Sequence, residues 1–94
     1  MDDPYLDIID EYWGKIVMMY NLFASKRPVM LLELPSLKIY AYPYKEYKAD
    51  LNQRSQAILT HQYQQAQANG QMVLFVRDNE KQKFRSYTLN LEQT

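Results

Sequence analysis

Cysteine is absent from this 94-residue sequence, which excludes disulfide bonds, thiolate metal sites, iron–sulfur clusters and cysteine nucleophiles. Glycine is scarce: Gly14 and Gly70 are the only two, so a glycine-rich phosphate-binding loop cannot form. The longest unbroken apolar runs have four or five residues, whereas a transmembrane helix needs about 20. The N-terminus is acidic and unlike a secretory signal. We expect a cytoplasmic domain with no cofactor and no contact with membranes.

Basic charge is not in excess, because 11 Lys and Arg balance 11 Asp and Glu. The charges are unevenly spread: residues 2–11 hold five acids and no base, and bases exceed acids from Trp13 onward. The simpler interpretation is that the acidic and basic segments form complementary surfaces within one fold or dimer. The more specific interpretation is that the basic residues form a face that binds an acidic partner. A neutral total disfavours sequence-independent binding to nucleic acid, which depends on a strongly basic domain.

Residues with catalytic or metal-binding chemistry are few. The single histidine, His61, has only alanine, isoleucine and glutamine three and four positions away, so no carboxylate accompanies it on a helix. Asp7, Asp10 and Glu11 share one helix face, which is typical of a solvated surface rather than a cation site. Because the sequence also lacks the common phosphate-loop, zinc-protease and serine-hydrolase motifs, we predict no catalytic residue, no metal and no enzymatic activity.

The segment Pro4–Phe23 predicts an amphipathic helix. At about 100° per residue its large apolar side chains fall on one side, with acids and Gly14 on the other. Asp3 is suited to cap the helix and Pro4 to occupy its first turn. The apolar side consists of Tyr5, Ile9, Tyr12, Trp13, Ile16, Met19, Tyr20 and Phe23.

Two almost wholly apolar runs, Val29–Leu34 and Met72–Arg77, predict strands that are covered on both faces and therefore central in a sheet. Each is followed by a more polar strand, Leu37–Tyr42 or Gln82–Leu91, which we place at the edges. The Gln- and Ala-rich segment Tyr44–Ala68 predicts a second helix, although its first turns could form a loop or a separate short helix. Residues 92–94 are expected to fray.

The predicted fold class is α+β, in the order αββαββ, with two helices packed on a four-stranded antiparallel sheet in a single domain spanning residues 1–94. Phe84 falls out of phase with Tyr87, which predicts a bulge or twist between them. The predicted core consists of Trp13, Ile16, Tyr20, Leu32, Ile39, Leu74 and Val76. The predicted inward stripe of the second helix consists of Tyr44, Tyr47, Leu51, Ser55, Ile58, Leu59, Gln62 and Ala66.

Tyrosines alternate with lysines around the second strand and the start of the second helix. Tyrosine is enriched in protein interfaces, and aromatics flanked by bases also hold single-stranded nucleic acid. We predict a small protein-binding, adaptor-like domain and keep a single-stranded nucleic-acid-binding module as the alternative. That alternative would use Lys38, Tyr40, Tyr42, Lys45, Arg77, Lys83 and Arg85.

The predicted partners are a second copy of this chain and an unidentified protein. The helix Pro4–Phe23 carries apolar side chains around about half its circumference, wider than the roughly 100° stripe that a surface helix needs. A small domain has few elements left to cover this surface. We therefore expect a two-fold interface that contains Met18 or Leu22 with the aromatic neighbours Tyr12 or Tyr40.

Overall fold

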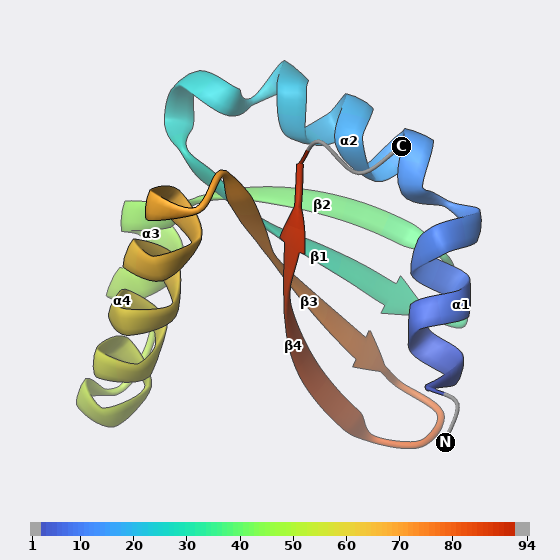
Figure 1. The fold of residues 1–94 in the computed structure, drawn as a ribbon. Helices are drawn as coiled ribbons and strands as arrows, with labels where there is room; N and C mark the ends of the chain where they lie inside the picture. Colours follow the sequence, from blue (N-terminus) through green and yellow to red (C-terminus); the bar gives the residue numbers. More distant parts are fainter. Residues whose placement is uncertain (1–2, 92–94) are drawn as a thin grey trace.

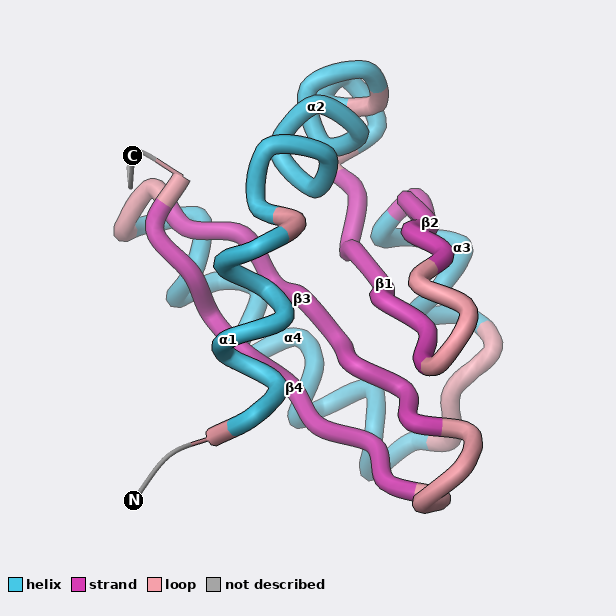
Figure 2. Tube along the Cα trace, turned by 90° about the vertical axis from the view of Figure 1, so that its right-hand side faces the viewer, coloured by secondary structure: helices cyan, strands magenta, loops and turns pink. Residues whose placement is uncertain are grey.

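A four-stranded sheet lies between two layers of helices in the computed structural model, which describes residues 3–91 (Figures 1 and 2). The helices of the first layer are α1 and α2, and those of the second are α3 and α4. The elements are α1 (Pro4–Glu11), α2 (Trp13–Leu22), the 3-10 helix η1 (Ala24–Lys26), β1 (Pro28–Leu34), β2 (Lys38–Pro43), α3 (Tyr44–Ala49), α4 (Gln53–Ala68), β3 (Gln71–Asp78) and β4 (Lys83–Asn90). The predicted fraying of residues 92–94 lies outside the described part of the chain.

The first predicted helix is divided in two. Tyr12 leaves helical geometry, with φ −103° and ψ 15°, so α1 ends at Glu11 and α2 begins at Trp13. Asp3 caps α1 as predicted, because its Oδ1 accepts a hydrogen bond of 2.9 Å from the backbone N–H of Tyr5. The division lets the two helices follow the twisted sheet that they cover (Figure 2).

The second predicted helix is also divided, by a turn over residues 50–52. Asn52 caps α4 through a 2.8 Å hydrogen bond from the backbone N–H of Ser55 to its Oδ1. Gly70 follows the end of α4 with φ 64°, a left-handed conformation that glycine adopts without the strain of a Cβ. The observed order within the described residues is therefore ααββααββ, and the predicted αββαββ was wrong in having one helix for each pair.

The strand order is β2-β1-β3-β4, so the two apolar strands are central and the two polar strands are at the edges, as predicted. Both hairpins are antiparallel, but β1 and β3 are parallel, with Met30 opposite Leu74 and Leu34 opposite Asp78. The sheet is thus mixed, and the prediction of a purely antiparallel sheet was wrong. The cause is the helical connection through α3 and α4, which returns the chain to start β3 beside β1 in the same direction.

Each face of the sheet has its own apolar core. On the α1/α2 face the buried side chains are Tyr5, Ile9, Ile16, Met30, Leu32, Leu34, Met72, Leu74 and Val76. On the α3/α4 face they are Val29, Leu31, Leu59, Tyr63, Ala66, Val73 and Phe75. Two helical layers explain why both central strands are apolar on consecutive residues.

Four of the seven predicted core residues, Ile16, Leu32, Leu74 and Val76, are fully buried. The other three were expected to be equally buried but are only partly so, because they pack at the margin of the core on the α1/α2 face. These three residues are Trp13, Tyr20 and Ile39.

Strand β4 keeps a regular register with β3 from Gln71 opposite Asn90 to Asp78 opposite Lys83, and the predicted bulge is not present in it. Phe84 is out of phase with Tyr87 because the two side chains project from opposite faces of the sheet. Tyr87 packs against the core of the α1/α2 face, whereas Phe84 stacks on Phe75 of the α3/α4 face.

Candidate binding surfaces

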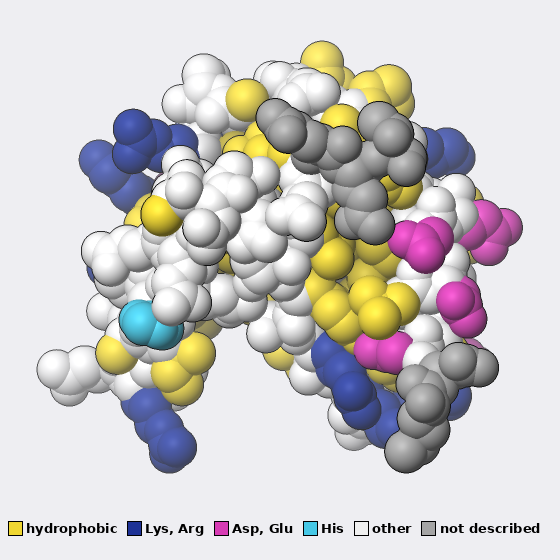
Figure 3. All heavy atoms as spheres, in the orientation of Figure 1, with side chains coloured by type: hydrophobic (Ala, Val, Ile, Leu, Met, Phe, Trp, Pro, Cys, Tyr) yellow, Lys and Arg dark blue, Asp and Glu magenta, His cyan; other side chains and the backbone are white. Residues whose placement is uncertain are grey.

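The most exposed large apolar side chains of the described residues form two pairs. Met18 and Leu22 are 56% and 69% exposed on α2, and Ile58 and Phe84 are 60% and 55% exposed on α4 and β4. Figure 3 shows hydrophobic side chains at the top of the molecule, over α2. Each pair marks a surface where apolar area remains open to solvent.

The first surface is the α2 ridge, which we define as Met18, Leu22 and the following Phe23. Met18 and Leu22 are four residues apart and so lie on consecutive turns of one helix face. The predicted interface neighbours do not join them in one patch. Tyr12 packs against the core of the α1/α2 face, and Tyr40 packs on the α3/α4 face.

The second surface begins with a stack of five aromatic rings across the α3/α4 face. Adjacent ring centroids are 5.8, 5.7, 5.5 and 5.3 Å apart along the stack. Its members, in spatial order, are Tyr40, Tyr42, Tyr47, Phe75 and Phe84. The stack passes from the edge strand β2, under α3, to the exposed ring on the other edge strand. Tyr40, Tyr42 and Tyr47, from the second strand and the start of the second predicted helix, thus lie in one stack, while the nearby Tyr44 stacks on Tyr63 instead, at 3.9 Å.

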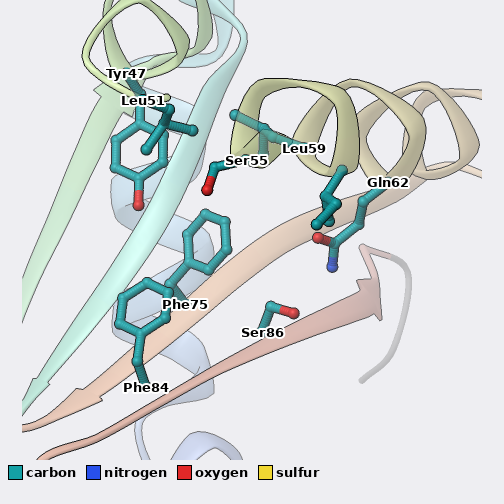
Figure 4. A pocket seen from close by; sticks show the side chains of 9 residues that line it. Tyr47, Leu51, Ser55, Leu59, Gln62, Phe75, Phe84 and Ser86 are labelled. Atoms are coloured by element: carbon teal, nitrogen blue, oxygen red, sulfur yellow. The ribbon is translucent and has the colours of Figure 1, made fainter. Parts of the chain in front are cut away.

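A hollow of about 240 Å³ opens where α4 diverges from the sheet (Figure 4). Its aromatic rings come from Tyr47, Phe75 and Phe84, and Ser86 lies beside them on β4. Figure 3 shows the notch between the lower part of α4 and the strands. The nine lining residues are Tyr47, Leu51, Ser55, Ile58, Leu59, Gln62, Phe75, Phe84 and Ser86, none of which carries a charge at neutral pH.

A second hollow of about 360 Å³ lies on the α3 side and shares Tyr47, Leu51 and Phe84 with the first. Its lining residues are Leu31, Tyr42, Pro43, Glu46, Tyr47, Asp50, Leu51, Arg77 and Phe84. We call the two adjoining hollows the aromatic cleft. Sequence reasoning missed this site. The signal that could have indicated it was Phe84, an apolar residue that falls on the otherwise polar side of the edge strand.

The predicted nucleic-acid residues are divided between the two faces of the sheet. Tyr40 and Tyr42 pack on the α3/α4 face, and the strand pairing places Lys38 and Arg77 on that face with them. Lys83 and Arg85 alternate with Phe84 and so project from the opposite face. Lys45 is exposed on α3. Arg77 is further committed to an ion pair with Glu33, whose oxygen lies 2.9 Å from its guanidinium nitrogen.

Two tyrosine–carboxylate hydrogen bonds attach the start of α1 to the sheet. The hydroxyl of Tyr5 donates to Asp78 and that of Tyr87 donates to Asp3, each at 2.8 Å. These bonds hold the pKa of both carboxyls below the ordinary value of 3.8. The bond to Asp78 raises the pKa of Tyr5, and burial followed by the bond to Asp3 raises the pKa of Tyr87 to about 12.

We expect the stability of the fold to fall at both ends of the pH range. The lowered carboxyl pKa values of Asp3 and Asp78 stabilise the fold above pH 3.8, and this contribution is lost as the pH falls through the folded values. The raised pKa of Tyr87 stabilises the fold below pH 10.0, and this contribution is lost as the pH rises to about 12. Urea unfolding across this range should show both losses, and Tyr87→Phe should weaken each. Identical pH profiles for the two proteins would contradict this account.

The residues considered for catalysis and metal binding remain on the surface. His61 is exposed on α4, and Asp7, Asp10 and Glu11 are exposed on α1, where Figure 3 shows acidic side chains gathered. Within residues 3–91, no group of three or more His, Cys, Asp or Glu is arranged to hold a metal ion.

In comparisons with known proteins, no family model matches the chain, no curated protein matches its sequence and no solved structure matches its fold. The helices in the described part of the chain include none that is both long and apolar enough to cross a membrane. Function must therefore be inferred from the two apolar surfaces themselves.

Proposed function

We propose that this chain is a small protein-binding domain, and that one of its partners is a second copy of itself, docked through the α2 ridge. The observation that carries the proposal is the adjacent exposure of Met18 and Leu22 on the outer side of a helix whose inner side already packs on the sheet. Exposed apolar side chains that lie together, rather than singly, are typical of protein interfaces.

The size of the chain is compatible with such a dimer. A specific interface buries about 800 Å² on each partner, and the whole chain exposes 6474 Å². A helix placed against its own copy across a two-fold axis meets the same ridge, so Met18 and Leu22 of one copy would contact those of the other. Apolar side chains without charge at the centre of the contact suit this arrangement.

Light scattering at micromolar concentration tests the proposal. We expect a mass near twice the 11.3 kDa of one chain for the wild type, and a mass near 11.3 kDa for Leu22→Lys, because a charge buried without a partner is strongly unfavourable. Ile58→Lys is the matched control, since it adds the same charge at an equally exposed site on α4 and should leave the dimer intact.

A wild type with the mass of one chain would contradict self-association. A dimer that persists in both Leu22→Lys and Met18→Lys would show that another surface makes the contact.

The nucleic-acid alternative has less support than protein binding. Its basic residues lie on two faces of the sheet, and Arg77 is paired with Glu33, so they do not form one continuous basic track. The net charge of zero also gives little counterion release on binding a polynucleotide.

A further inference from the structure

We infer that the aromatic cleft is a second protein-docking site, and that its occupant is an extended segment of another protein with an aromatic side chain next to a basic one. This inference is independent of the dimer, because the cleft lies on the α3/α4 face and the α2 ridge belongs to the helical layer on the other face. It rests on the shape of the two hollows, on the exposed ring of Phe84 and on the charges beside it.

The first hollow has the properties of a site for one aromatic side chain. Its volume of about 240 Å³ is below the range of roughly 300–1,000 Å³ that is usual for drug-sized ligands. Phe84 stacks on the buried ring of Phe75 and is itself 55% exposed, so its ring has area left for an inserted aromatic side chain to stack on. Because all lining residues are uncharged, a charged group placed here would lose its hydration without a counter-charge.

The second hollow supplies the charge that the first one lacks. Glu46 on α3 and Asp50 directly after it line this hollow, next to the rings of Tyr42 and Tyr47. Arg77 also lines it, but its charge is compensated by Glu33 at 2.9 Å. The lining therefore has an excess of negative charge beside aromatic faces, which is the arrangement that attracts Lys or Arg side chains.

The charges at the other border of Phe84 indicate on which side of the aromatic side chain the basic one lies. A third hollow of about 290 Å³ at the β3–β4 turn is lined by Arg77, whose charge is compensated by Glu33, and by Lys83 and Asp78, whose charges balance each other. A basic side chain is thus favoured toward α3, where acids are in excess, rather than toward the turn, where they are not.

The test uses four capped tetrapeptides and amide NMR titration of the full chain. Two of them are acetyl-Gly-Phe-Lys-Gly-amide and acetyl-Gly-Lys-Phe-Gly-amide. The other two are analogues of whichever of these binds more tightly, one with Gln in place of Lys and one with Ala in place of Phe. We expect one of the two orders to shift the amides of Tyr47, Leu51 and Phe84 and to leave Met18 and Leu22 unmoved. The Gln analogue should bind about two- to fivefold more weakly, as an exposed ion pair gives, and the Ala analogue should not bind measurably.

Variants separate the two parts of the site. Phe84→Ala should abolish binding, since it removes the exposed ring shared by both hollows. The double change of Glu46→Gln and Asp50→Asn should make the Lys and Gln peptides bind equally. The matched control, Asp10→Asn with Glu11→Gln, removes two exposed acids on α1 and should preserve the preference for Lys.

Several outcomes would overturn the inference. If the wild type bound the Lys and Gln peptides equally, the inference that the partner carries a basic side chain would be wrong. If no peptide shifted any amide, the inference that the cleft is a docking site would be wrong. Shifts of the cleft amides on dilution without peptide would identify a second copy as the occupant. Binding of 2-phenylethanol as tightly as the Phe-Lys peptide would identify a small aromatic molecule instead.

Discussion

Leu74→Ala is expected to lower the free energy of unfolding by about 3–5 kcal/mol. Leu74 lies in the middle of β3, is fully buried, and faces the core under α1 and α2. Its neighbours across the sheet, Met30 on β1 and Tyr87 on β4, are fixed by strand pairing and cannot close the space that the lost side chain would leave. Because small domains are stable by about 5–15 kcal/mol, the variant should be close to unfolding at 37 °C.

Leu6→Ala is the matched control for this prediction. Leu6 is 40% exposed on α1, so the same chemical change removes little buried area and replaces leucine with the residue of highest helix propensity. Its effect should stay within about 1 kcal/mol. Urea denaturation followed by the fluorescence of the single tryptophan measures both variants, and equal midpoints for the two would contradict the assignment of Leu74 to the centre of the core.

The positions of the strands could be predicted because their chemistry is local. Val29–Leu34 and Met72–Arg77 are apolar on consecutive residues, a pattern typical of a strand that is covered on both faces. Both strands are central in the sheet. The relative direction of β1 and β3, which join the two hairpins, does not follow from the residues within either strand, and the prediction of an antiparallel sheet was wrong there. A helical segment between two strands is the usual sign of a parallel crossover, so the information was present in the order of elements.

The placement of side chains on α4 was predicted only in part, because the break between α3 and α4 was not placed. The inward stripe predicted for one continuous helix over residues 44–68 includes Leu59 and Ala66, which are buried as predicted, but it crosses the turn at residues 50–52. Ile58, which the stripe places inward, is 60% exposed, and Tyr63, which it leaves out, is buried with its hydroxyl 3.2 Å from the carbonyl oxygen of Arg27. Asn52, a favoured N-cap residue, was the sequence signal for this second start.

The two exposed apolar surfaces could be predicted only in part for a related reason. The exposure of Met18 and Leu22 could be anticipated because they lie on one helix, whose period is known. The aromatic cleft combines side chains of all four strands with those of α3 and α4, and its first hollow depends on the angle at which α4 leaves the sheet. No local pattern specifies that angle, so these elements could not be brought together from sequence.

Phe75→Ala is expected to lower the free energy of unfolding by about 3–5 kcal/mol, through the core of the α3/α4 face. Phe75 is buried on the α3/α4 face and lies in the aromatic stack between Tyr47 and Phe84, 5.5 Å from the ring of the first and 5.3 Å from that of the second. Its removal would leave a cavity beneath α3 and α4, which would loosen both helices against the sheet. The variant should therefore lose stability and cleft binding together.

Phe84→Ala separates these two effects, because it deletes the same side chain at the next ring of the stack. Phe84 is 55% exposed, so little buried area is lost, and the expected cost is about 1 kcal/mol, most of it from the ring contact with Phe75. Urea denaturation should therefore place Phe84→Ala near the wild type and Phe75→Ala far below it, while peptide titration should show loss of binding in both. If the two variants were equally destabilised, Phe84 would be part of the core, and the exposed ring on which the cleft depends would not exist.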